Sequence, residues 1–180
     1  MIFDVARRMW LAVLPVLLAS AALAQLGRVP NVTMAPVPLV TAPRAAQTLV
    51  NLNFRVGSDF HINSNTPKSE FLIPTTLSID VPTDIVLGKI SYPPGKDLTF
   101  PFLPDETLNV YSGDFTVTVA VHPLHSVLPA KYVMHGTLRY QACDNAQCFP
   151  PKTLPLSFEI KVVKEPPTGH HNPPQSPSLH

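Results

Sequence analysis

Residues 153–163 read Thr-Leu-Pro-Leu-Ser-Phe-Glu-Ile-Lys-Val-Val, and apolar side chains occupy every second position. The apolar set consists of Leu154, Leu156, Phe158, Ile160 and Val162. A period of two residues is typical of a β-strand with one buried face. This run is the longest of its kind in the chain, and it favours a fold built from sheets.

The same alternation occurs in four other segments, which are residues 50–56, 77–81, 115–121 and 137–141. Shorter strand candidates lie at residues 60–64, 85–91 and 108–111. No segment carries the apolar stripe of an amphipathic helix. Seven to nine short strands, separated by proline and turn residues, predict an all-β chain folded as an immunoglobulin-like antiparallel β-sandwich.

Residues 1–24 have the organisation of a secretory signal. Arg7 and Arg8 precede an apolar run, and a small-x-small cleavage site ends at Ala24. The apolar run is short for a membrane span, which favours cleavage over retention as an anchor but leaves both open. Export places the protein in the periplasm or outside the cell, where two cysteines persist as a disulfide.

The composition divides the remaining chain into three parts. Residues 25–46 are rich in proline and are expected to form a flexible linker, and residues 165–180 a disordered tail rich in proline and histidine. The folded domain is expected at residues 47–164, which is enough chain for one ordinary domain.

Two cysteines, Cys143 and Cys148, lie in the stretch Tyr-Gln-Ala-Cys-Asp-Asn-Ala-Gln-Cys-Phe-Pro-Pro at residues 140–151. Four residues separate them, about the length of a hairpin loop, so they can face each other across the neck of a turn. A ring this small gives only about 2 kcal/mol of stability in the chain-entropy model. That modest gain favours a chemical role for the bond.

The register of the strands around the cysteines predicts an irregularity. If Cys143 opposes Cys148 in a regular hairpin, Leu138 opposes Thr153, whereas the apolar positions of the following strand are even-numbered. The two patterns differ by one residue, which predicts a bulge near residues 149–151. Cys143 also has the parity of the polar positions before it. The pair is therefore expected near the surface or a sheet edge, where it can be attacked.

Six short motifs occur in order along the chain. They are Phe-His-Ile-Asn-Ser-Asn at 60–65, Phe-Leu-Ile-Pro-Thr at 71–75, Tyr-Pro-Pro-Gly at 92–95, Val-Tyr-Ser-Gly at 110–113, Tyr-Gln-Ala-Cys at 140–143 and Cys-Phe-Pro-Pro at 148–151. Together they resemble the N-terminal periplasmic domain of DsbD-type thiol:disulfide interchange proteins. The resemblance covers about residues 47–163 and again implies an immunoglobulin-like sandwich.

The resemblance also implies residue roles. Cys148 would form a mixed disulfide with a partner protein, and Cys143 would resolve it. A cap loop at residues 96–103 would cover the pair, with Phe100 or Phe102 as the shield. Three further residues are expected near the site, and they are His61, Asn63 and Tyr140. A histidine beside the sulfurs would favour a thiolate, but a solvent-exposed His61 without a role is the expectation.

By the same resemblance the chain would be an exported exchange protein of the protein-disulfide reductase type, acting without a cofactor in cytochrome c biogenesis. It would carry electrons between a membrane-embedded thiol reductase domain and periplasmic thioredoxin-like proteins. We expect it to rely on separate partners at both ends of that path, and no small-molecule substrate is evident.

Three other interpretations are less favoured. A passive disulfide in a secreted β-sandwich interaction module remains the alternative function, and Asp144 beside the pair supports it because a carboxylate raises a thiol pKa. A metal site would use His122 and His125, or His170 and His171 in the tail. It is less favoured because four residues separate the two cysteines, whereas the cysteines of structural zinc sites are commonly separated by two. A net charge of +1 argues against nucleic acid binding.

Overall fold

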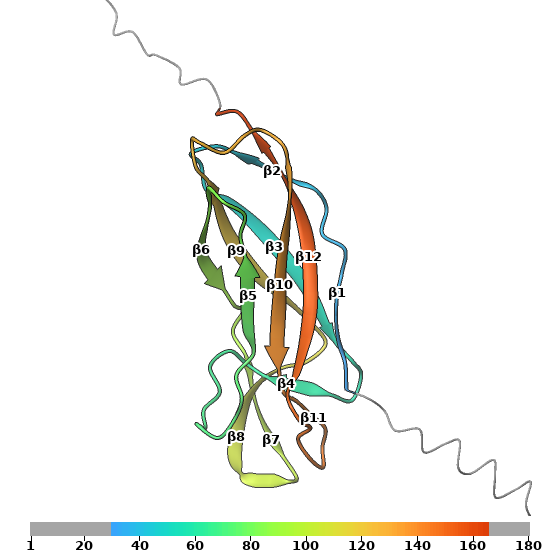
Figure 1. Ribbon diagram of the computed structural model, residues 1–180. Coiled ribbons are helices and arrows are strands. Elements are labelled where there is room, and N and C mark those ends of the chain that lie inside the picture. The colour runs from blue at the N-terminus through green and yellow to red at the C-terminus, as the bar shows by residue number, and fades with distance from the viewer. Residues whose placement is uncertain (1–29, 166–180) are drawn as a thin grey trace, which may run out of the picture. The chain divides into compact units, whose positions relative to one another are not determined.

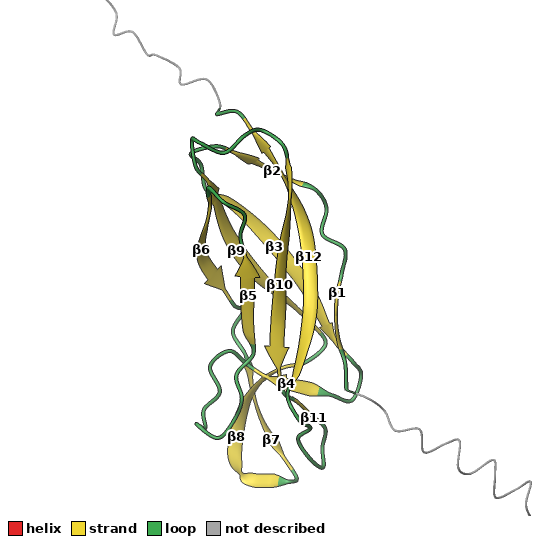
Figure 2. Ribbon diagram, viewed as in Figure 1, coloured by secondary structure: helices red, strands yellow, loops and turns green. Residues whose placement is uncertain are grey.

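The computed structural model describes residues 30–165, and the expected signal segment and the tail beyond residue 165 lie outside this range. The described part contains twelve strands and no helix, so the prediction of an all-β fold is confirmed (Figure 2). The strands are β1 (Val32–Met34), β2 (Val40–Pro43), β3 (Thr48–Val56), β4 (His61–Asn63), β5 (Thr76–Asp80), β6 (Ile85–Ser91), β7 (Lys96–Phe100), β8 (Leu103–Tyr111), β9 (Asp114–Pro123), β10 (Lys131–Tyr140), β11 (Ala142–Cys143) and β12 (Lys152–Val163). No helix able to cross a membrane occurs within residues 30–165.

Two four-stranded sheets pack face to face as an immunoglobulin-like sandwich (Figure 1). One sheet has the strand order β1-β3-β9-β6 and the other β2-β12-β10-β5. The alternating apolar residues of the sequence point between them, as the burial of Leu52, Leu138 and Ile160 shows. The period-two pattern thus sets which face of each strand is buried.

The predicted linker at residues 25–46 is structured in its described part, and the flexible interpretation is wrong there. β1 pairs with β3, placing Val32 opposite Val56, and β2 pairs with β12, placing Val40 opposite Ile160. Both strands have only three or four residues, too few to show a period of two. Pro43 is compatible with β2 because this strand lies at a sheet edge. The pairing of β2 with β12 is parallel, an exception in an otherwise antiparallel sandwich.

A third sheet, with the order β11-β4-β8-β7, extends from the end of the sandwich where β10 ends (Figure 1). It contains the expected short strands near residues 60–64 and 108–111. The expected cap loop at residues 96–103 is here a hairpin, formed by β7 and the start of β8. The sequence pattern did not predict β7 because the side chains of residues 96–99 are all exposed and lack apolar alternation. The third sheet carries the cysteine pair and the residues around it.

Candidate functional site

Cys143 and Cys148 form a disulfide with an S–S distance of 2.07 Å and a Cα–Cα distance of 4.0 Å. Cys143 ends β11, and Cys148 follows a tight turn. The side chain of Asp144 holds this turn, because its Oδ1 accepts hydrogen bonds of 2.8 Å from the backbone N–H groups of Ala146 and Gln147. The carboxylate near the sulfurs therefore has a structural task in the loop.

The register around the pair contains the predicted irregular step. Leu138 lies opposite Leu154 and Tyr140 opposite Lys152, whereas Cys143 forms an isolated bridge with Cys148. Between the ladder and the bridge, residues 141–142 on one side face residues 149–151 on the other. The extra residue is in the Phe-Pro-Pro segment, where the two prolines cannot donate to a ladder.

The two sulfur-bearing residues differ in exposure. Cys148 is partly exposed, whereas Cys143 is completely buried. Neither belongs to the hydrophobic clusters of the described residues, so the pair lies outside the sandwich core, as predicted. The pair was expected near the surface or a sheet edge, and each cysteine meets one of these conditions: Cys148 is partly exposed, and Cys143 is buried but lies on β11, the edge strand of the third sheet. An attacking thiolate can therefore reach Cys148 more easily.

Strand β4 places two of the expected neighbours beside the pair. His61 is the direct register partner of Cys143, and Asn63 follows two residues later on the same face of β4. His61 is 4% exposed, so the expectation of a solvent-exposed histidine is wrong. Burial lowers the pKa of His61 to about 4, opposed in part by the negative charge of Asp144, and the ring is neutral at pH 7.

Gln141, which sequence reasoning did not select, connects the segments around the pair. Its Nε2 donates to the carbonyl oxygen of Phe149, the residue after Cys148, at 3.2 Å. Its Oε1 accepts from Asn63 Nδ2 at 3.2 Å and from the Ile73 N–H at 3.3 Å. The sequence signal for Gln141 was its position as a polar residue two positions before a cysteine. Its hydrogen-bond partners could not be predicted, because they depend on the arrangement of the third sheet.

The structure places both predicted cap residues at the same end of the domain. Phe100 is buried and stacks on His61, with ring centroids 3.9 Å apart and planes inclined by 12°. Phe102 stacks on Phe100 at 5.7 Å. The stack therefore connects the β7–β8 hairpin to β4, the strand on which His61 lies opposite Cys143.

Tyr140 is not part of this group. Its side chain belongs to the sandwich core, and its hydroxyl hydrogen-bonds to the backbone of Val32 in β1. Burial raises the pKa of Tyr140. Tyr140 is absent from the site because successive side chains of a strand point to opposite faces: Tyr140 faces the core, and Gln141 faces the other side.

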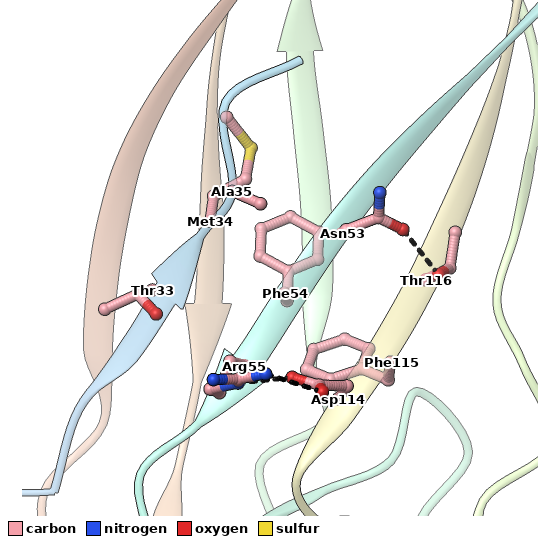
Figure 3. Close-up of a pocket in the computed structure, with 9 residues that line it drawn as sticks. All are labelled: Thr33, Met34, Ala35, Asn53, Phe54, Arg55, Asp114, Phe115 and Thr116. Atoms are coloured by element: carbon pink, nitrogen blue, oxygen red, sulfur yellow. Dashed lines mark hydrogen bonds and ion pairs between the residues drawn. The ribbon is translucent and has the colours of Figure 1, made fainter. Parts of the chain in front are cut away.

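The described residues contain two further features that do not include the cysteines. His125 is exposed and lies 2.6 Å from a carboxylate oxygen of Glu165, and residues 30–165 contain no cluster of three or more metal-ligating side chains. Figure 3 shows a hollow between β1, β3 and β9, in which Arg55 and Asp114 form a two-pronged ion pair. None of the predicted site residues lines this hollow.

Comparison with known proteins adds independent information. A family model described as the N-terminal part of the thiol:disulfide interchange protein DsbD matches residues 33–159. No curated protein sequence matches the chain.

Several solved structures are similar. The reduced DsbD N-terminal domain of Neisseria meningitidis is 21% identical, with 66% of this chain and 80% of that chain covered and a TM-score of 0.40. The N-terminal periplasmic domain of ScsB from Proteus mirabilis is 12% identical, with 71% and 44% covered and a TM-score of 0.43. A complex of the DsbD and PilB N-terminal domains of Neisseria meningitidis gives 19% identity, 72% and 80% coverage, and a TM-score of 0.39.

The buried His61 predicts a loss of stability in acid. An unfolded histidine binds a proton below its ordinary pKa of 6.5, whereas the folded protein binds it only as the pH approaches about 4. The contribution of His61 to the free energy of unfolding is therefore complete above pH 6.5, and it falls as the pH is lowered from 6.5 to about 4. The gap between the two pKa values corresponds to about 3 kcal/mol at most.

Urea unfolding at several pH values, compared between the unmodified protein and His61→Phe, measures this contribution. The comparison removes the effect of the carboxylates, which both proteins share. We expect the unmodified protein to lose up to about 3 kcal/mol more than the variant between pH 7 and pH 4. Parallel curves for the two proteins would contradict the assignment.

Proposed function

The chain belongs to the family of N-terminal domains of DsbD-type thiol:disulfide interchange proteins, and on this premise we propose that it passes electrons through the Cys143–Cys148 disulfide between exported proteins. The observation that carries the proposal is the disulfide itself, formed within the matched region by two cysteines only five positions apart. A short ring of this kind can open and close with little movement of the backbone.

The difference in exposure supports a division of roles. In the oxidised protein, one thiolate of a reduced partner attacks the Sγ of the partly exposed Cys148, forms a mixed disulfide with it and leaves Cys143 as a thiolate. The second thiol of the partner then displaces Cys148, so that both cysteines are reduced and the partner holds the disulfide. In the reverse direction, Cys148 attacks a partner disulfide, and Cys143 then displaces the partner from Cys148. Each complete exchange moves two electrons and converts one dithiol to a disulfide while the other disulfide becomes a dithiol.

The proposed setting is the periplasm. The partners would be thioredoxin-like proteins on one side and a membrane-embedded thiol reductase domain on the other, as the family resemblance implies, with a place in cytochrome c biogenesis. The net charge of +1 is consistent with protein partners and argues against nucleic acid binding.

Phe100 is proposed as the shield of the pair. It is buried over His61, and its own outer neighbour is the half-buried Phe102. The β7–β8 hairpin that carries it pairs with the rest of the third sheet through β8, whose register partner is β4.

The alternative function is an interaction module with a passive disulfide. The observation that favours it is the complete burial of Cys143 together with the hydrogen bonds of Gln141 to the segments around the pair. Single-cysteine variants separate the two functions.

Cys143→Ser is expected to accumulate a mixed disulfide with an exported thioredoxin-like protein, because Cys148 can still attack and no neighbouring thiol displaces the partner. Cys148→Ser is expected to capture the same partner at least about tenfold less, since the remaining thiol is buried. Non-reducing electrophoresis of each variant with the oxidised partner measures the product. Equal capture by the two variants would contradict the division of roles, and capture by neither would favour the passive disulfide.

Phe100→Ala is expected to speed the reduction of the disulfide by glutathione, by about tenfold, because the stack that covers His61 and the adjacent strand is removed. Leu98→Ala is a matched control, since Leu98 lies on the same strand but is 40% exposed. The rate is followed by alkylating the thiols that appear with time. Phe100 is not the shield if both variants react at the rate of the unmodified protein.

A further inference from the structure

Two buried polar atoms on β4 have no hydrogen-bond partner among residues 30–165. They are His61 Nε2 and Asn63 Oδ1. A buried polar atom without a hydrogen-bond partner is destabilising because it has lost its hydrogen bonds to water, and native structures contain few such atoms. Two on one short strand, on the same face, indicate a task outside the stability of the fold.

The position of β4 identifies that task. His61 is directly opposite Cys143 in the antiparallel pair of β4 and β11. Directly opposed residues share a face, with Cβ atoms about 4.5–5.5 Å apart. The imidazole and the Cys143 side chain therefore lie next to each other, and Phe100 covers the imidazole on its ring face.

The chemistry of the reduced state creates a need for a base at this place. When the disulfide opens, Cys143 becomes a thiol in a buried position, and burial raises the pKa of a thiol. A thiol is a poor nucleophile, and the thiolate that forms the new S–S bond must first lose its proton. Solvent has little access to a residue with no exposed surface.

We propose that His61 is the general base that takes the proton from Cys143 when this thiol resolves a mixed disulfide on Cys148. The inference rests on the proposed function of the disulfide and adds a catalytic residue to it. The Cys143 Sγ–H proton moves to the imidazole while Sγ attacks Cys148 Sγ. The bond between Cys148 and the partner sulfur breaks, and the departing partner thiolate receives the proton from the imidazolium. The pair is oxidised by two electrons and the partner is reduced by two.

The surroundings of His61 suit a base that is restored after each turnover. Burial lowers the pKa of His61 and keeps the ring neutral at periplasmic pH, so that a ring nitrogen has a lone pair available to accept a proton. Asp144, in the adjoining turn, is the charged group that acts on His61 and favours the transient imidazolium. Phe100 from β7 contributes no charge, and Cys143 from β11 supplies the proton.

The test follows the two steps of exchange separately, with oxidised glutathione as the probe and the full chain in its reduced form. Acid quenching and mass spectrometry measure the glutathione adduct on Cys148 and the closed disulfide over time. His61→Phe keeps a ring that can stack on Phe100 but removes the base, and His61→Gln keeps a polar side chain without a basic nitrogen. His135→Phe is the matched control, because His135 is exposed on β10.

We expect both His61 variants to capture glutathione at the rate of the unmodified protein but to close the disulfide about 100-fold more slowly at pH 7, so that the adduct accumulates. Their closure rate should rise about tenfold for each pH unit up to the thiol pKa, whereas closure in the unmodified protein changes little between pH 6 and pH 8. His135→Phe should match the unmodified protein.

Closure within twofold of the unmodified rate at pH 7 in either His61 variant would overturn the inference. Slower closure with the pH dependence of the unmodified protein would also overturn it, because it indicates a packing role only. If the unmodified reduced protein itself forms no adduct and no disulfide, the proposed function fails, and the inference fails with it.

Discussion

A one-residue offset between two neighbouring pairings determines the structure of the site. The ladder of β10 and β12 pairs Tyr140 with Lys152, but the bridge three residues later pairs Cys143 with Cys148. Beyond the extra residue on the Phe-Pro-Pro side, β11 stays bridged to the Cys148 segment and also pairs with β4. Cys143 therefore has Cys148 as one backbone neighbour and His61 as the other.

The two cysteines lie in different environments. Cys148 is partly exposed after the turn, whereas Cys143 is buried. His61 lies opposite Cys143, and Phe100 stacks on the His61 ring. The hydrogen bonds of Gln141 fix the Phe149 carbonyl group relative to Asn63 and Ile73. A cysteine pair with one partly exposed and one buried sulfur is suited to bind a partner at the exposed sulfur and to displace it with the buried one.

The sandwich could be predicted from the sequence because its strands are long enough to show a period of two, as in residues 153–163. The irregular step was also predictable. A regular hairpin that pairs the two cysteines would place Leu138 opposite residue 153, one position away from the apolar Leu154. The strands β1, β2 and β11 were not predictable, because they are short and pair with distant parts of the chain. β7 was not predictable because its side chains at residues 96–99 are exposed and show no alternation.

The same reason limits prediction of the site. The burial of His61 and the network of Gln141 depend on β4 lying against β11, which joins residues about 80 positions apart. The sequence motifs placed His61 and Asn63 near the cysteines by resemblance, but they gave no reason to expect a buried, neutral imidazole. Tyr140 was misplaced because its parity directs it into the sandwich core.

The reduction potential of the Cys143–Cys148 bond tests the central claim most directly. It is measured by equilibrating the folded protein in glutathione or dithiothreitol buffers and counting free thiols by alkylation. The account predicts a value well above about −300 mV, as expected of a bond that exchanges with partner proteins. A value below this, or reduction only when the protein unfolds, would contradict the account and identify the bond as a structural disulfide.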